Sequence, residues 1–282
     1  MRRFKTFIQE MAAVNVADLN TEFISKAERV ISFNLSPNNF TNLEFKNEIQ
    51  YLIKKHYFPK FDLSKTIKGQ PTVKKLNALI EPLKSKYPSM YNKLHNYNLK
   101  GVGPGEATLY FLLDDGYLGG GTSGGIDMTV GSTPYEIKAA LVNSQKTHVS
   151  GFKLGAGVDY KRIITELMKM KDEYGIKTTG KGKEEIPGKS GIMVMRERDP
   201  QKMAKLDKEF QKECRDYFGN KQVIFISNNS SSKIVKEFPD AGKQKVLSAS
   251  GGTIISIQKV NPLKCQIQVV TQGVIKPIIS LK

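Results

Sequence analysis

Residues 101–140 have the sequence GVGPGEATLYFLLDDGYLGGGTSGGIDMTVGSTPYEIKAA. Three glycines and Pro104 in residues 101–105 indicate a turn, and Pro104 so close to Glu106 is typical of a helix start. The apolar residues 107–113 then predict a short helix. After a glycine-rich run over 116–125, residues 126–130 and 135–140 predict two strands joined by a turn at 131–134.

Charged side chains lie at particular positions of these two strands. Asp127 is on the first strand, and Glu136 and Lys138 are two residues apart on the second. Because residues i and i+2 of a strand point to one face, Glu136 and Lys138 should project together while Ile137 points into the core. The tight connection should bring Asp127 beside them, and Glu106 on the preceding helix could add a third carboxylate.

The whole chain is strongly basic. Its 282 residues include 44 Lys and Arg against 27 Asp and Glu, so the net charge is +17 and the pI is about 9.6. This surplus favours a polyanionic partner, most often nucleic acid. The alternative is a lysine-rich, solvated surface without a ligand.

The surplus is unevenly distributed. Residues 1–100 hold 17 basic and 8 acidic side chains, residues 101–150 hold 2 and 5, and residues 151–282 hold 25 and 14. A carboxylate-rich segment therefore interrupts a basic chain. This distribution suits a metal site that faces a phosphate backbone, since carboxylates attract the cation and the flanks attract the polyanion.

Other features exclude several protein classes. No run approaches the roughly 18 apolar residues of a membrane span, and the basic start lacks the apolar segment of a secretory signal. We therefore expect no membrane partner and a cytoplasmic, non-secreted protein. Two cysteines argue against a disulfide scaffold and against a multi-cysteine zinc site.

Two domains are expected. Residues 1–100 should form a helical region that could bind DNA, with helices over 18–33, 45–57, 73–83 and 90–97 and interruptions at Pro82 and Pro88. Residues 101–282 should form an α/β domain with a mixed sheet. Its remaining predicted elements are helices over 159–174 and 200–217, a loop over 175–189, and strands over 191–195, 222–227, 253–260 and 265–271.

The motifs of residues 105–106, 125–127 and 136–138 resemble the PD-(D/E)XK nuclease superfamily. Many type II restriction enzymes, phage exonucleases and Holliday-junction resolvases share its restriction-endonuclease-like fold. The order is similar: a helix glutamate, an aspartate that opens a strand, and E-x-K on the next strand. The match departs where Ile126 stands in place of proline. The sequence of these motifs is also similar to that of nucleases encoded by large tailed phages. Residues 1–100 lie outside the resemblance.

The resemblance implies a metal-dependent deoxyribonuclease, either an endonuclease or an exonuclease, located in a bacterial or phage-infected cell. Asp127, Glu136 and the backbone carbonyl of Ile137 would bind one or two Mg²⁺ ions, for which Mn²⁺ should substitute. Lys138 would position the attacking water or stabilise the transition state, and Glu106 would hold a second ion or a metal-bound water. DNA is the implied partner, and a homodimer stays open.

Basic residues after the motif are candidates for contacts to DNA phosphates. They are Lys146, Lys153, Lys161 and Arg162. The glycines of 119–125 could either form a linker or allow close approach of DNA.

Other functional classes are less well supported by the sequence. Residues 175–182 resemble a phosphate-binding loop, but Gly182 occupies the Ser/Thr position. The three histidines lack the spacing of a zinc site, and His148 is expected at the surface. The alternatives to the DNA nuclease are a non-catalytic DNA-binding or phage structural protein that retains the fold, and a nuclease that acts on RNA.

Overall fold

The computed structural model describes residues 67–86, 91, 95, 105–118, 126–154, 158–176, 188–227, 231–234, 246–249, 252–271 and 274–282. The predicted helices over 18–33 and 45–57 lie outside these residues, as do most of the predicted helix over 90–97, the glycines of 119–125 and most of the predicted loop over 175–189.

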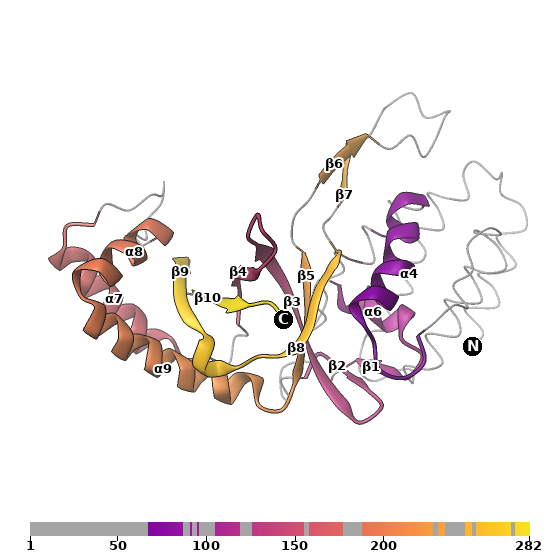
Figure 1. Ribbon diagram of the computed structural model, residues 1–282, viewed down its shortest axis with the longest axis horizontal. Helices are drawn as coiled ribbons and strands as arrows, with labels where there is room; N and C mark the ends of the chain where they lie inside the picture. Colours follow the sequence, from indigo (N-terminus) through magenta and orange to yellow (C-terminus); the bar gives the residue numbers. More distant parts are fainter. Residues whose placement is uncertain are drawn as a thin grey trace, which may run out of the picture.

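The described residues alternate between helices and strands (Figure 1). The helices are α4 (Val73–Lys86), α6 (Glu106–Leu112), α7 (Lys161–Glu173), α8 (Lys189–Arg198), α9 (Pro200–Phe218) and the short 3₁₀ helix η4 (Pro262–Lys264). The strands are β1 (Gly116–Leu118), β2 (Met128–Val130), β3 (Thr133–Val142), β4 (His148–Phe152), β5 (Gln222–Ser227), β6 (Ser231–Ile234), β7 (Val246–Ala249), β8 (Ile254–Lys259), β9 (Gln266–Thr271) and β10 (Val274–Ser280).

Strand β3 organises an eight-stranded mixed sheet within the described part of the chain. It pairs antiparallel with β2 near its start and with β4 near its end, and parallel with β5 over residues 135–140. Strand β1 extends the sheet beyond β2, β10 and β9 extend it beyond β4, and β8 pairs antiparallel with β5. Strands β6 and β7 form a separate two-stranded sheet. The predicted α/β class with a mixed sheet is confirmed.

Helices pack on different parts of this sheet. Helices α8 and α9 contact β9, whereas α4 contacts β8 and α6 contacts β1 (Figure 1). Amphipathic spacing explains how α7 and α9 pack on the sheet. Ile163 and Leu167 of α7 and Phe210 of α9 share one apolar core with Phe152 and Phe225 of the sheet. Phe225 lies edge-on to Phe152, with ring centroids 5.3 Å apart.

The predicted strand over 191–195 is wrong, because these residues lie in α8. Ile192 and Met195 are buried whereas Met193 between them is 51% exposed. Positions i and i+3 share a face of a helix but point to opposite faces of a strand, so only a helix buries both. Asp199 ends α8, and its carboxylate accepts the backbone N–H of Lys202 at 2.9 Å to begin α9.

One further prediction needs correction. Pro82 does not interrupt the helix over 73–83, since α4 continues through it to Lys86. Strand β1, for which no strand was predicted, opens the glycine-rich run over 116–125. Strands β4, β6, β7 and β10 were not predicted.

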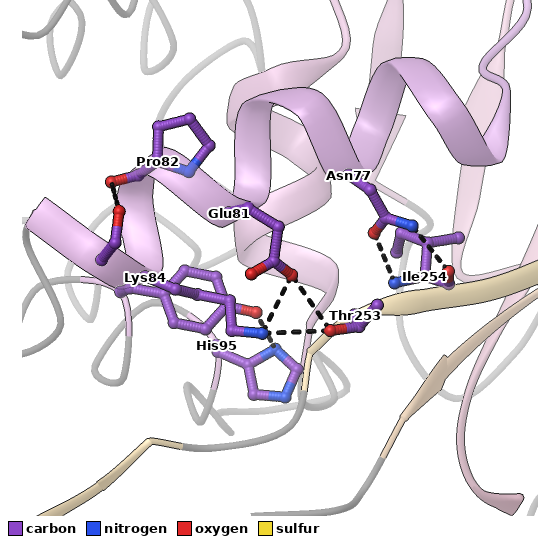
Figure 2. A network of polar contacts seen from close by, with 9 residues as sticks. Asn77, Glu81, Pro82, Lys84, His95, Thr253 and Ile254 are labelled. Carbon is purple, nitrogen blue, oxygen red and sulfur yellow. Dashed lines mark hydrogen bonds and ion pairs between the residues drawn. The ribbon is translucent and has the colours of Figure 1, made fainter. Parts of the chain in front are cut away.

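Residues N-terminal to the motif stretch pack against the sheet. Ile67 forms a parallel β-bridge with Leu113. Figure 2 shows the contact between α4 and the start of β8: the Asn77 side chain donates to the carbonyl of Ile254 and accepts its N–H, both at 2.8 Å. Nearby, the Lys84 ammonium donates to Glu81 and to Thr253. Helix α4 therefore satisfies backbone groups of the strand that it covers.

No helix among the described residues is long and apolar enough to cross a membrane.

Candidate functional site

The β2–β3 hairpin positions Asp127 beside the middle of β3. Gly131, with a φ of 59°, lies in the turn, and Met128 of β2 faces Tyr135 of β3. Asp127 comes just before β2, and its N–H donates to the carbonyl of Tyr135 at 3.1 Å. Its carboxylate accepts the backbone N–H of Ile137 at 2.7 Å. The Asp127 side chain is thus held at the backbone of the residue between Glu136 and Lys138.

Lys138 joins the two carboxylates. Its Nζ lies 2.5 Å from Oε1 of Glu136 and 3.9 Å from Oδ2 of Asp127. Since both distances start at one nitrogen, these two oxygens are at most 6.4 Å apart, the sum of 2.5 and 3.9 Å. The structure therefore brings Asp127, Glu136 and Lys138 into one cluster.

Glu136 is the centre of this cluster, and its side chain is only 2% exposed. In addition to Lys138, the Tyr217 hydroxyl donates to Oε1, and Lys221 donates to Oε2 at 2.9 Å. Tyr217 lies in the last turn of α9, and Lys221 comes just before β5. Because β5 runs parallel to β3 and places Val223 opposite Glu136, the start of β5 reaches the same part of the sheet.

The Tyr217 ring contacts both lysines. The Nζ of Lys221 lies 4.6 Å from the ring centroid and that of Lys138 lies 5.3 Å from it. Both distances are within the range of cation–π attraction. The ring and Glu136 together hold the two ammonium groups in a largely buried place, since the lysine side chains are 13% and 10% exposed.

The two carboxyl groups have different proton affinities. Burial raises the pKa of Asp127 to about 6, and the Glu136 carboxylate adds to the rise while Lys138 opposes it. Burial alone would also raise the pKa of Glu136, but Lys138 and the hydrogen bonds from Tyr217 and Lys221 lower it overall. Glu136 is therefore held as a carboxylate, and Asp127 is the member of the pair that more readily takes a proton.

The third predicted carboxylate does not complete a ligand group in the described structure. Glu106 is buried in the first turn of α6. Among the residues that the structure describes, no three acidic, histidine or cysteine side chains form a group that could hold a metal ion. Within this part of the chain, Glu106 is thus not placed with Asp127 and Glu136 as a third ligand.

The predicted phosphate contacts lie on exposed segments after β3. Lys146 is in the β3–β4 turn with a φ of 56°, and Lys153 directly follows β4. Lys161 and Arg162 begin α7, where Arg162 forms an ion pair with Glu209 at 3.2 Å. All four are accessible to solvent, but Arg162 already has an acidic neighbour.

The two histidines that the structure describes, His95 and His148, contact residues outside this cluster. His148 is in contact with Thr147 at 3.0 Å. His95 is buried, stacks on Tyr91 and accepts the N–H of Gly105 through its backbone carbonyl.

Tyr217 and Lys221 are the site residues that the sequence analysis missed. They are 81 and 85 residues from Glu136 along the chain. The available signal was local: Lys221 directly precedes the apolar run of β5, so a parallel pairing of β5 with β3 would have placed it near Glu136.

Comparison of the chain with protein-family models, with curated proteins and with solved structures finds no match.

Proposed function

We propose that the protein is a metal-dependent deoxyribonuclease with a restriction-endonuclease-like core. The observation that carries the proposal is the convergence of Asp127, just before β2, with Glu136 and Lys138 of β3, so that both carboxylates lie within reach of one ammonium group. Two carboxylates and a lysine are the groups that a metal-assisted phosphodiester hydrolase needs.

The cluster fits a divalent cation in charge and in donor type. The Lys138 ammonium already lies close to both carboxylates, so a positive charge is accommodated there. Asp127 and Glu136, with the carbonyl of Ile137, would supply oxygen ligands of the kind that Mg²⁺ and Mn²⁺ prefer. Burial is the main cause of the raised pKa of Asp127, and the Glu136 carboxylate adds to the rise, so a cation bound at this pair would favour the charged form of Asp127. Bound there, the metal would supply an activated water and charge neutralisation at the phosphate.

The residues of the chain have separate roles in this proposal. Asp127 and Glu136 bind the cation, and Lys138 orients the water or stabilises negative charge on the phosphate. Glu106 stays a prediction for a second ion. The net charge of +17 supports DNA as the polyanionic substrate, with Lys146, Lys153, Lys161 and Arg162 as candidate backbone contacts. A homodimer likewise stays a prediction.

Cleavage assays on the full chain test the proposal. Supercoiled, linear, single-stranded and branched DNA are incubated with Mg²⁺, with Mn²⁺ or with EDTA. We expect metal-dependent cleavage by the wild type, and a loss of at least about 100-fold in D127N, E136Q and K138M. K169M is the matched control for K138M, since Lys169 is an exposed α7 residue paired only with Glu166 in the described structure. Intact substrates with either metal would exclude the nuclease.

A specific observation favours one alternative, a non-catalytic DNA-binding protein that retains the fold. Both Glu136 oxygens already accept protein donors, and the described residues hold no three-ligand group. This alternative predicts DNA binding that weakens steeply with salt but no cleavage under any metal condition. The same substrate panel therefore separates the two functions.

A further inference from the structure

Glu136 accepts hydrogen bonds on both of its oxygens. Oε1 accepts from Lys138 and Tyr217, and Oε2 accepts from Lys221 at 2.9 Å. A divalent cation needs a carboxylate oxygen at roughly 2.1 Å. In the observed arrangement, a cation that binds Oε2 of Glu136 must therefore share this oxygen with the Lys221 ammonium and lie close to its positive charge.

The two lysines are not equivalent. Lys138 extends from the same strand as Glu136 and lies near Asp127 as well. Lys221 comes from a different element, directly after the turn that closes α9, and its N–H donates to the carbonyl of Phe218 at 2.9 Å. Its ammonium is fixed between the Tyr217 ring and Oε2 of Glu136. Lys221 thus links the end of α9 and the start of β5 to the Glu136 carboxylate.

We propose that Lys221 is a positioning residue that holds Glu136 through Oε2 and competes with the divalent cation for that carboxylate. The inference rests on the proposed function, because it assumes that Glu136 is a metal ligand. Two opposite consequences follow from one contact. Like charges repel, so the nearby ammonium weakens cation binding. The same ammonium fixes the carboxylate, and a fixed ligand is needed for fast chemistry.

Removal of Lys221 should therefore change metal affinity and cleavage in opposite directions. Mn²⁺ binding to the full chain is measured without DNA, by electron paramagnetic resonance of the free ion. We expect K221M to bind Mn²⁺ at least about tenfold more tightly than the wild type. At saturating Mn²⁺ we expect K221M to cleave DNA about tenfold more slowly, through kcat rather than KM. K221R retains the positive charge and donor, so its affinity should return toward the wild-type value.

Two further variants keep the interpretation clear. K221Q removes the charge but retains a donor for Glu136, so it should show the same tightening and replaces K221M if that variant does not fold. K205M is the charge control, because Lys205 is exposed on α9 and the substitution lowers the net charge equally. It should leave Mn²⁺ affinity within about twofold.

The outcomes separate this inference from the proposed function. Mn²⁺ binding that D127N and E136Q leave intact would overturn the proposed metal site itself. Binding that both variants abolish, together with unchanged or weaker Mn²⁺ affinity in folded K221M or K221Q, would overturn only the role of Lys221. A purely structural role for Lys221 would lower affinity and activity together.

Discussion

Gly105 is the residue at which the chain turns into α6 and comes close to the sheet. Its φ of 90° lies in the left-handed region, and it immediately precedes Glu106 at the start of α6. A Cβ at this position would come within 2.5 Å of Cδ1 of Ile226, which is buried in β5. The glycine therefore allows both the turn and the close approach of α6 to the sheet.

Substitution of this glycine separates the backbone cost from the packing cost. Gly69 has a similar φ of 69°, but a Cβ there would contact nothing within 4 Å. We expect G69A to lower the free energy of unfolding by about 1 kcal/mol, the cost of a left-handed alanine. G105A should lower it by about 2–4 kcal/mol, because overpacking against Ile226 is added. Urea denaturation measures both, and equal losses would show that Ile226 moves aside without cost.

The candidate site was predictable from sequence only where its residues are close along the chain. Asp127, Glu136 and Lys138 lie on one hairpin, so strand alternation and a short turn are enough to bring them together. Tyr217 and Lys221 depend on the parallel pairing of β5 with β3, which leaves no periodic pattern in either segment. The sequence thus predicts that Glu136 lies close to Asp127 and Lys138, but it does not predict the hydrogen bonds of Glu136 with Tyr217 and Lys221.

At the scale of elements, prediction succeeded where an apolar pattern had one interpretation. Strand β5 was predicted with the bounds that the structure shows, and α9 within one residue. Residues 191–195 form an apolar run compatible with either a strand or a helix, and only the tertiary packing of α8 decides between them. Strand β4 contains Ser150 and Gly151, so its pairing with β3 and β10, rather than its own propensity, makes it a strand.

Helix α9 also presents a basic face that points away from the core. Its apolar face is buried, and four exposed basic residues lie on the opposite side at intervals of three and four: Lys205, Lys208, Lys212 and Arg215. Within the described part of the chain, no ion pair engages these four. They span about 15 Å at about 1.5 Å per residue. One DNA strand carries a phosphate about every 3.4 Å of axis, so the face can match about four phosphates.

Neutralisation of this face should weaken DNA binding in a salt-dependent manner. With all four residues changed to glutamine, the slope of log affinity against log salt concentration should become shallower by up to about 3.6, or about 0.9 for each phosphate that the face no longer neutralises. Fluorescence anisotropy in EDTA measures the slope without cleavage. The control changes four exposed lysines elsewhere, Lys189, Lys259, Lys264 and Lys282. An equal change in the control would show that net charge, and not the face of α9, determines binding.

At the scale of the whole molecule, stability should depend on pH through His95, a buried histidine of the N-terminal segment. Burial, followed by repulsion from Lys84, lowers the pKa of His95 from 6.5 to about 4. The ring stacks on Tyr91, whose hydroxyl is 3.4 Å from Nδ1, and Gly105 donates to the backbone carbonyl. The folded protein therefore favours neutral His95, whereas the unfolded chain accepts a proton near pH 6.5.

The sign of the pH effect follows from this difference. Above pH 6.5 both states carry neutral His95, and its titration contributes nothing to the stability difference. As the pH falls from 6.5 to 4, the unfolded state takes up a proton that the folded state does not bind, so stability falls by about 1.4 kcal/mol per pH unit.

Asp127 opposes this trend, because its raised pKa makes protonation favour the folded state in the same range. The wild type must therefore be compared with H95Q, which retains Asp127 but cannot titrate at residue 95. We expect the stability of the wild type relative to H95Q to decrease by about 3 kcal/mol between pH 7 and pH 4 in urea denaturation. A difference that does not change with pH would show that His95 keeps an ordinary pKa and that its place beside Tyr91 and Gly105 is open to water.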